Sequence, residues 1–410
     1  MEEREKLKRR LIGMNPDTEE IPTGLLNGTD LNAYQLTMIG YKRLTNIENL
    51  ISDIIRWDVK GDMIEAGCWR GGACIYMRKL LNDSNDKRMV IVCDSFEGLP
   101  KPEHPKDEGD THYMVSLLSV SMNEVITNFT KLGLTENIQF VKGWFADTLP
   151  KLNNTYSLIR LDGDMYKSTM DAISDLYPKL NEGGFCIIDD YGAVKGCKEA
   201  IHDYFETNDL HHELTAIDWT GYYFRKPFKD PVKEKVYQLS KEPSDINEHL
   251  QTLYKYACEC EDVVEFGTRD GVSTWALMGA TNLTCYDIGL CNLIEHNKLK
   301  KVRFIQKDSL EAVFYCDMLF IDTFHSYSQC KAELDTHAKN VRKYIILHDV
   351  EMFGYSDQDF PEGTINETSK IHGEKRGLIL AINDFLSENN EWFIKEHFKN
   401  NNGLMILKRL

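Results

Sequence analysis

Short apolar runs alternate with amphipathic stretches along most of the chain, and this rhythm occurs twice. In the first half a helical pattern over about 43–57 precedes an apolar run at 62–66, and a similar run spans 262–266 in the second half. Apolar runs of this length, alternating with helices, are typical of a parallel sheet covered on both faces. The sequence therefore predicts two tandem, Rossmann-like α/β domains. Further strands are expected at 89–94, 138–142, 156–162, 185–189, 283–287, 303–306, 317–322, 344–349, 392–397 and 403–408.

The boundary between the halves is expected in a charged, Pro-containing stretch that follows the first set of strands. The predicted organisation is a polar leader over 1–33, a first domain over 34–228, a linker over 229–249 and a second domain over 250–410. Two domains also agree with the length of 410 residues, which exceeds that of one ordinary core.

Charge and hydropathy exclude several classes of partner. A formal net charge of -17 disfavours a nucleic-acid partner, because such a surface repels phosphate backbones. No apolar run approaches the roughly 18 residues that a membrane span needs, and the first residues lack the apolar segment of a secretory signal. The eleven cysteines include no CxxC pair, which argues against a zinc site or a disulfide framework. We expect a cytoplasmic protein without a membrane partner.

A Gly-rich turn after the first strand predicts a ligand site. Glycines such as Gly67 and Gly71 let the backbone approach a ligand closely. The turn departs from GxGxxG, which counts against a dinucleotide and a dehydrogenase. Glu65, two residues before Gly67, is typical of an S-adenosylmethionine site, and Asp94 at the end of the next strand is placed to bind ribose hydroxyls. A tight strand–helix turn with solvated acids remains the alternative.

Four carboxylates follow two neighbouring strands, at the edge where such sheets bind ligands. They are Asp162, Asp164, Asp189 and Asp190. Adjacent strands lie about 4.8 Å apart, so these groups should converge. Like charges so close require a neutralising cation or proton, and oxygen donors suit Mg²⁺, Mn²⁺ or Ca²⁺. Helix capping is the alternative for one or two of them.

These motifs belong to a longer resemblance. The stretch from about 36 to 225 closely resembles the macrocin/mycinamicin O-methyltransferase family, Mg²⁺-dependent enzymes that methylate deoxysugar hydroxyls. Its segments here are IEAGCWRGG (64–72), DSFEGLP (94–100), KGWFADTLP (142–150), RLDGDMYKSTMDA (160–172) and LYPKLNEGGFCIIDDYG (176–192).

The resemblance implies a role for each matching residue. It assigns Asp162, Asp189 and Asp190 to the metal, Asp164 to the general base, and the following to S-adenosylmethionine: Glu65, Gly67, Gly71, Asp94, Ser95, Trp144 and Phe145. For Phe145 an ordinary core position stays open. The implied acceptor is a hydroxyl of a deoxysugar, nucleotide sugar or glycan. The polar segment 97–120 is expected to form a lid or acceptor loop.

The second half looks more distantly like class I methyltransferases of the cephalosporin-hydroxylase-like type, through VVEFGTRDGVST (263–274), FIDTFHSY (320–327) and LHDV (347–350). Cofactor positions recur at Glu265, Gly267 and Asp287, and metal positions recur at Asp322, His348 and Asp349. Phe324 stands where the first half has its base, so His325 would have to replace it. An active second methyltransferase and a structural or acceptor-binding domain both remain open.

Three other functions compete with sugar methylation. A catechol-type O-methyltransferase also chelates a diol on Mg²⁺, a non-catalytic glycan- or nucleotide-binding module needs no carboxylate set, and a dehydrogenase needs GxGxxG. The particular sugar, the hydroxyl and the oligomeric state, a homo-oligomer included, stay open.

Overall fold

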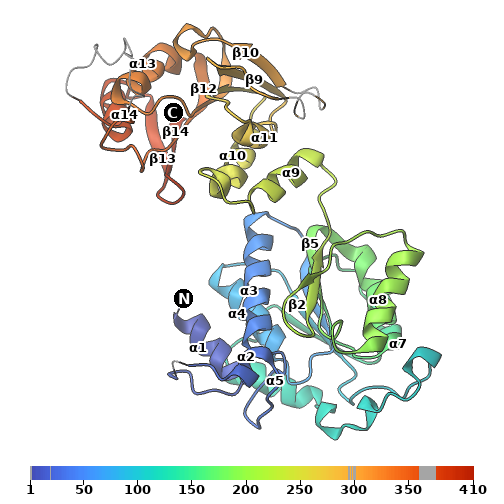
Figure 1. The fold of residues 1–410 in the computed structure, drawn as a ribbon. Coiled ribbons are helices and arrows are strands. Elements are labelled where there is room, and N and C mark those ends of the chain that lie inside the picture. Colours follow the sequence, from blue (N-terminus) through green and yellow to red (C-terminus); the bar gives the residue numbers. More distant parts are fainter. Residues whose placement is uncertain (1, 19, 294–295, 297, 299–301, 360–374) are drawn as a thin grey trace. The chain divides into compact units, whose positions relative to one another are not determined.

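The computed structural model describes residues 2–18, 20–293, 296, 298, 302–359 and 375–410. The chain folds into two compact units, Met1–Pro227 and Phe228–Leu410 (Figure 1). Each unit contains a seven-stranded sheet, and the order of strands along the sheet is the same in both. The expected pair of tandem Rossmann-like α/β domains is therefore confirmed.

The first unit carries strands β1 to β7 and helices α1 to α8. The strands are β1 (Asp62–Ala66), β2 (Val90–Asp94), β3 (Ile138–Lys142), β4 (Tyr156–Leu161), β5 (Leu180–Ile188), β6 (Thr215–Ala216) and β7 (Tyr222–Arg225). The helices are α1 (Glu2–Leu11), α2 (Thr23–Asn27), α3 (Gly40–Arg56), α4 (Gly72–Asp83), α5 (Met122–Lys131), α6 (Phe145–Thr148), α7 (Tyr166–Leu176) and α8 (Lys195–Thr207).

The second unit repeats the plan with shorter helices at its start. Its strands are β8 (Asp262–Phe266), β9 (Asn282–Asp287), β10 (Val302–Gln306), β11 (Cys316–Ile321), β12 (Val341–His348), β13 (Trp392–Phe398) and β14 (Leu404–Arg409). Its helices include α9 (Pro231–Leu239), α10 (Leu250–Ala257), α11 (Val272–Leu277), α13 (Tyr327–His337) and α14 (Leu378–Glu388).

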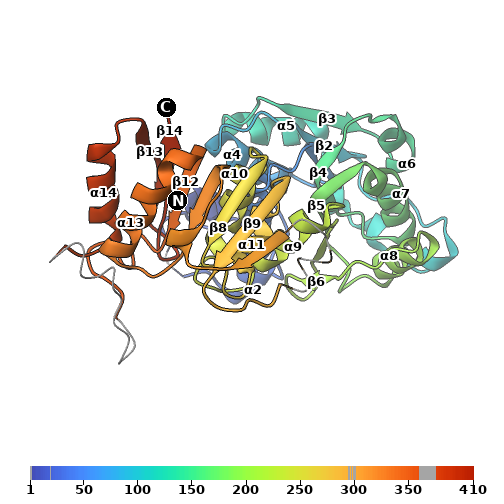
Figure 2. The same ribbon diagram turned by 90° about the horizontal axis from the view of Figure 1, so that it is seen from above.

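The sheets run β3-β2-β1-β4-β5-β7-β6 and β10-β9-β8-β11-β12-β14-β13. The first five strands of each order are parallel, and the last two pair antiparallel. In the first unit, Figure 1 shows α3 and α4 on one face of the sheet and α7 and α8 on the other. Figure 2 shows β8 beside β9, and α13 beside α14, within the second unit. Because both faces are covered, the central strands are almost wholly buried, and most of their residues are apolar.

The turn after the first strand of each sheet requires glycine. Gly67 has φ +96°, and a Cβ there would lie 1.7 Å from the backbone oxygen of Asp162. Gly267 has φ +82°, and its Cβ would lie 1.9 Å from the oxygen of Asp322. A side chain at either position would therefore push apart the ends of two adjacent strands.

The expected leader is part of the first unit. Leu7 and Leu11 of α1 are buried, and α1 packs on α3 and α4. Lys8 is buried as well, and its ammonium group lies 2.5 Å from Glu5 and 3.0 Å from Glu48. The long aliphatic stem allows this burial while the charge stays paired.

The expected linker, 229–249, contains the helix α9. Asp230 caps α9 by accepting the N–H groups of Val232 and Lys233, and Pro231 occupies its first position. Val232 and Val236, one helical turn apart, are buried where α9 packs on α10 and α11. In the sequence, the charged residues around Val232 and Val236 obscure this short amphipathic pattern.

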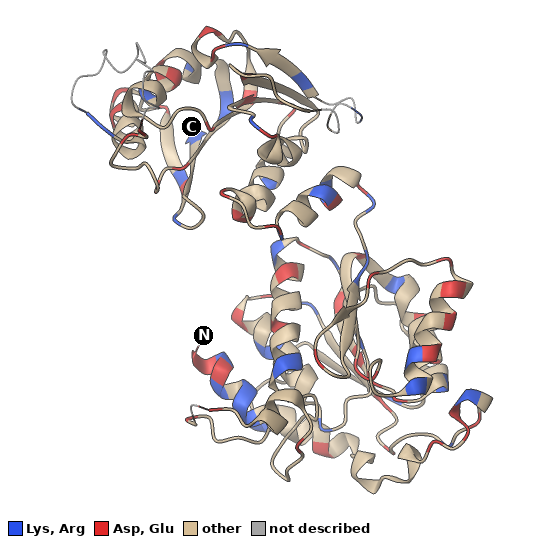
Figure 3. Cartoon of the chain, viewed as in Figure 1, with Lys and Arg blue, Asp and Glu red and all other residues tan. Residues whose placement is uncertain are grey.

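Basic and acidic residues share the same helices, as α1 illustrates in Figure 3. Such interspersed charge is typical of a solvated surface. Among the described residues, the structure contains no helix with the length and apolar character needed to span a membrane.

Candidate active site

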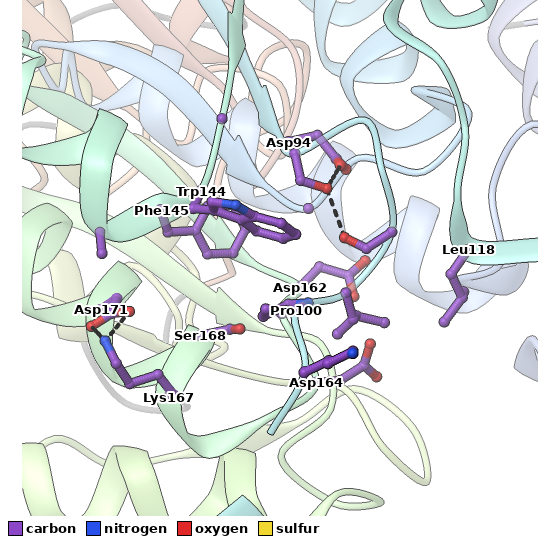
Figure 4. A pocket seen from close by; sticks show the side chains of 18 of the residues that line it. Asp94, Pro100, Leu118, Trp144, Phe145, Asp162, Asp164, Lys167, Ser168 and Asp171 are labelled. Atoms are coloured by element: carbon purple, nitrogen blue, oxygen red, sulfur yellow. Dashed lines mark hydrogen bonds and ion pairs between the residues drawn. The ribbon is translucent and has the colours of Figure 1, made fainter. Parts of the chain in front are cut away.

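A pocket of about 480 Å³ lies in the first unit beside the ends of β1, β2 and β4. The sequence predicts seven residues of this unit at the cofactor and one, Asp164, as the base. Six of these eight line the pocket: Gly67, Asp94, Ser95, Trp144, Phe145 and Asp164. Asp162 of the expected metal set lines it too. In the view of Figure 4, Trp144 and Phe145 lie on the side of the pocket opposite Leu118. Trp144 is 40% exposed, which leaves its ring available to a ligand.

The carboxylate of Asp94 is held by backbone donors. It accepts the N–H of Cys68 and the N–H of Phe96, each at 2.8 Å. Each carboxylate oxygen retains a further lone pair. Ser95, next to it, donates from its hydroxyl to the carbonyl of Gly98 at 2.6 Å. The end of β2 therefore presents a fixed hydrogen-bond acceptor to the pocket.

Three carboxylates converge at the ends of β4 and β5. Asp162, Asp189 and Asp190 each offer an oxygen, and these oxygens lie within 4.8 Å of one another. Asp164 borders the pocket two residues beyond Asp162, with φ +54°. Non-glycine residues seldom adopt this left-handed conformation, and it occurs preferentially at functional sites.

The electrostatics of this cluster are uneven. Burial, and then the charge of Asp189, raises the pKa of Asp162 to about 8. Burial raises the pKa of Asp164 to about 6, although His112 opposes the shift. Burial and the neighbouring acids also raise the pKa of Asp190. For Asp189, burial acts in the same sense, but Arg160 and Arg43 outweigh it and lower its pKa.

Two buried arginines were missing from the sequence-based site. Arg160 is paired with Glu65 and Asp189, and it also contacts Asp162 at 2.8 Å. Arg43 donates to Asp189 at 2.6 Å and lies 3.0 Å from Asp218. The signal that could have found Arg160 is a lone charged residue inside the otherwise apolar strand β4, since buried charges are almost always paired.

Glu65 and Gly71 lie outside the lining of this pocket. Glu65 is fully buried behind it, and burial raises the pKa of its carboxyl against the opposing charge of Arg160. Gly71 caps the start of α4 with φ +84°. Asp189 and Asp190 also lie outside the lining.

The expected lid contributes to the pocket at both of its ends. Gly98, Leu99 and Pro100 line it from one end of the segment, and Leu118 lines it from the other. Three short 3₁₀ turns run between them (Pro105–Asp107, His112–Met114 and Ser116–Leu118). Asp107 in this segment accepts the N–H groups of Tyr166 and Lys167, which ties the segment to the start of α7.

Comparison with known proteins identifies the family. The sequence pattern of the macrocin-O-methyltransferase (TylF) family matches residues 14–226, half of the chain. The chain belongs to this family.

Individual relatives agree with that assignment. The macrocin-type chain is 44% identical over 207 residues to demethyldecarbamoylnovobiocin O-methyltransferase of Streptomyces niveus, a match that covers 48% of this chain and 79% of the relative. It is 41% identical over 210 residues to mycinamicin III 3''-O-methyltransferase of Micromonospora griseorubida, covering 49% and 82% respectively. The solved structure of the O-methyltransferase NovP superposes with a TM-score of 0.52 at 38% identity, covering 55% of this chain and 98% of that one. The first unit is therefore a macrocin-type O-methyltransferase domain, with S-adenosylmethionine as methyl donor.

The second unit has a similar constellation at its own strand ends. Asp287 accepts the N–H groups of Arg269 at 3.0 Å and Gly289 at 2.8 Å, as Asp94 does with its own neighbours. Glu265 is buried and accepts hydrogen bonds from the hydroxyls of Ser273 and Thr274 at 2.6 and 2.7 Å.

The tight group of possible metal ligands in the second unit differs from the expected one. It comprises Asp322, His325 and Asp349, whose ligand atoms lie within 4.8 Å of one another. His348, expected as the nitrogen ligand, lies further from them, with its Nδ1 at 3.5 Å from Asp322 and 3.6 Å from Asp349. Sequence position alone favoured His348, because it corresponds to Asp189 at the end of the neighbouring strand.

Proposed function

We propose that the first unit transfers a methyl group from S-adenosylmethionine to a sugar hydroxyl, with the help of a divalent cation bound by Asp162, Asp189 and Asp190. The observation that carries the proposal is the convergence of these three carboxylates within 4.8 Å beside the pocket that contains Asp94 and Trp144.

The donor set fits a hard cation. All three groups are carboxylates, the ligands that Mg²⁺ prefers in proteins. Oδ2 of Asp190 is buried and has no hydrogen-bond partner among the described residues. Arg160 and Arg43 supply two positive charges, whereas six carboxylates lie around them: Glu65, Asp162, Asp164, Asp189, Asp190 and Asp218. A divalent cation would offset part of this excess.

The remaining chemistry belongs to the chain's own residues. A bound divalent cation would acidify and orient the acceptor hydroxyl. Asp164 takes the proton from that hydroxyl as its oxygen bonds to the methyl carbon and the bond from carbon to the sulfonium sulfur breaks. The products are a methyl ether, S-adenosylhomocysteine and a protonated Asp164, which returns its proton to solvent.

Other residues orient the methyl donor. Asp94 accepts hydrogen bonds from the ribose hydroxyls, and Trp144 and Phe145 cover the adenine. Glu65 acts from behind the pocket through Arg160, since its carboxylate does not border the cavity. Holding donor and acceptor in line contributes by proximity and orientation.

A sugar is the proposed acceptor because one relative, 41% identical over 207 residues, is named 8-demethyl-8-(2,3-dimethoxy-alpha-L-rhamnosyl)-tetracenomycin-C 4'-O-methyltransferase, and its named substrate carries a rhamnosyl group. A panel of deoxyhexoses, nucleotide deoxysugars, glycans and catechols, with products identified by mass spectrometry, tests this choice. Methylation of catechol in preference to every sugar would contradict it.

Chelation tests the cation. Treatment with excess chelator should abolish methyl transfer, Mg²⁺ should restore it, and binding of S-adenosylmethionine should persist throughout. Asp190→Asn should raise the Mg²⁺ concentration required, whereas Asp175→Asn, at a half-buried acid of α7 that does not line the pocket, should not. Full activity in excess chelator would refute the metal role.

We also propose that the second unit binds S-adenosylmethionine, through Glu265, Gly267 and Asp287. The close approach of Gly267 to Asp322 and the two backbone donors on Asp287 support this. Calorimetric titration of the full chain should then give two bound molecules. Asp162→Asn combined with Asp164→Asn isolates the second unit, and any remaining transfer that Asp349→Asn removes would make the chain bifunctional. One bound molecule and no remaining transfer would favour a scaffold or acceptor-binding role.

A further inference from the structure

The described part of the second unit contains a mixed nitrogen and oxygen cluster whose nitrogen donor, His325, differs from the one expected from the sequence. Asp322 follows β11, Asp349 follows β12, and His325 precedes α13. Nε2 of His325 lies 3.2 Å from Oδ1 of Asp322 and 3.1 Å from Oδ2 of Asp349. All three side chains are buried. The cluster lies at the carboxyl ends of parallel strands, where sheets of this type bind ligands.

The hydrogen bonds of His325 determine which ring nitrogen carries the proton. Nδ1 lies 3.0 Å from Oε1 of Gln358, and the backbone N–H of His325 donates to the same oxygen at 3.3 Å. An amide oxygen only accepts, so Nδ1 must donate. In the neutral ring, Nε2 then turns its lone pair toward two carboxylate oxygens. This arrangement is repulsive unless a cation or a second proton lies between them.

The ring of His325 is also fixed in orientation. It stacks on Phe353 with centroids 4.9 Å apart and an interplanar angle of 6°. The backbone N–H of Gln358 donates to the carbonyl of His325 at 2.7 Å, which holds the two residues together. A histidine whose far nitrogen is held by an oxygen acceptor is typical of metal ligation, since that bond selects the tautomer.

His348 provides an independent observation. Its side chain is completely buried, and its Nδ1 has no hydrogen-bond partner among the described residues. This nitrogen points toward the cluster, 3.5 Å from Asp322 and 3.6 Å from Asp349. Its Nε2 lies 3.4 Å from the carbonyl oxygen of Asn401, which accepts a hydrogen bond from it. Oδ1 of Asp349 is likewise buried, and it has no hydrogen-bond partner in the part of the chain that the structure describes.

We propose that Asp322, His325 and Asp349 bind a divalent transition-metal ion in the second unit. Metal–ligand bonds of about 2.0–2.2 Å put neighbouring ligand atoms about 3 Å apart, close to the 3.1 and 3.2 Å found here. His348 lies at the edge of the set, able to complete it after a small shift.

The nitrogen donor distinguishes this site from that of the first unit. An imidazole donor suits Fe²⁺, Ni²⁺, Cu²⁺ or Zn²⁺, and the two carboxylates beside it also accept Mn²⁺, whereas three carboxylates favour Mg²⁺. The chain would then carry two cations of different chemical class. The proposal goes beyond the function proposed above and does not depend on it.

Pulsed electron paramagnetic resonance with Mn²⁺ tests the site in the full-length chain. The carboxylates of the first unit are first changed by Asp162→Asn and Asp190→Asn, so that the remaining binding belongs to the second unit. One Mn²⁺ should bind to this chelator-stripped protein and show coupling to an imidazole nitrogen. Adding His325→Ala should remove both the coupling and tight binding. Gln358→Leu should weaken Mn²⁺ binding by roughly 10–100-fold, the usual effect of losing a residue that orients a ligand.

Two controls separate ligation from damage to the fold. His397→Ala removes an imidazole that pairs with Glu351 elsewhere in the same unit, and Mn²⁺ binding should not change. Asp349→Asn keeps the shape of the side chain, and it should weaken binding while the near-ultraviolet circular dichroism stays unchanged. Absence of nitrogen-coupled Mn²⁺, or equal affinity after His325→Ala, would overturn the proposal. A doubly protonated His325 in excess Zn²⁺, detected by nitrogen NMR, would overturn it as well.

Discussion

The two units place the same backbone around two different sets of charges. In the first unit, β4 sets Arg160 beside Glu65 in register, and in the second, β11 sets Phe320 beside Glu265. At the end of the next strand, Asp189 of the first unit corresponds to His348 of the second, one residue after the paired positions Ile188 and Leu347. The first unit therefore has an additional acid, Asp189, paired with the buried guanidinium of Arg160. The second unit has neither group at the corresponding positions.

This difference shows that two domains can share a fold while the side chains at their strand ends carry different charges. Glu65 is neutralised by Arg160, whereas Glu265 accepts hydrogen bonds from Ser273 and Thr274. Removal of the guanidinium also removes the reason for an acid at position 348, because a buried carboxylate without a partner is costly. A histidine there keeps a polar group without a permanent charge. The glycine turn and strand register remain, since they depend on backbone geometry.

The largest expected difference concerns the base. Asp164→Asn should lower turnover by the first unit by about 10²–10⁴-fold, the usual contribution of a general base, while affinity for S-adenosylmethionine is kept. Phe324→Leu, at the corresponding position of the second unit, should leave that turnover unchanged. Steady-state rates and calorimetric titration of both variants measure this. Near-normal turnover in Asp164→Asn would show that Asp164 does not act as the general base, so that it would not differ from Phe324 in this respect.

The next comparison replaces the residue beside each buried glutamate with methionine. Arg160→Met leaves three acids without their shared partner and should destabilise the first unit by about 3–5 kcal/mol. Phe320→Met exchanges one apolar side chain for another and should cost the second unit less than about 1.5 kcal/mol. Hydrogen exchange followed by mass spectrometry reports the two units separately. Equal costs would mean that the guanidinium is not essential to the charge balance of the first unit.

A smaller effect is expected in the dependence of stability on pH. Burial, opposed by donors from Ser273, Thr274 and Cys285, raises the pKa of Glu265 from 4.5 to about 7, and the charge of Asp322 adds to the shift. The unfolded chain therefore releases this proton at lower pH than the folded chain. The stabilisation is complete below pH 4.5 and is lost as pH rises through 7, by about 3 kcal/mol in total.

Glu265→Gln should remove this dependence and make the second unit more stable than the parent at pH 8. Denaturant unfolding of both proteins between pH 4 and 8 gives the comparison. If the parent and the variant show the same pH profile, Glu265 is ionised in the folded protein. It would then resemble Glu65, whose charge is paired with that of Arg160.

The smallest expected effect concerns the affinity of each unit for S-adenosylmethionine. Trp144 follows β3 by two residues, and the corresponding residue after β10 is Asp308. Trp144→Ala should weaken binding of S-adenosylmethionine to the first unit by about 0.5–1.5 kcal/mol, the range for one aromatic contact, or about two- to tenfold in Kd. Asp308→Ala should not weaken binding to the second unit. Two-site calorimetry resolves these values, and an unchanged first site would exclude adenine stacking on Trp144.

The sequence by itself determined the fold and the order of the chemical groups in this protein. Apolar runs predicted the central strands of both sheets, because fully covered parallel strands must be apolar on both faces. Asp94, Asp162 and Asp189 were located correctly at strand ends, since the carboxyl ends of parallel strands share one edge. The density of family motifs in the first half then assigned the reaction.

Only the tertiary structure decided which of these groups meet. Arg43 and Asp189 are 146 positions apart, and no local pattern predicts their 2.6 Å hydrogen bond. His325 and His348 were both at the right edge of the second sheet, yet the contact of Nδ1 with Gln358 turns His325 into the cluster. Side-chain direction depends on neighbours distant in the chain, whereas apolar periodicity depends on residues close in sequence, and this is why the first needed the folded structure.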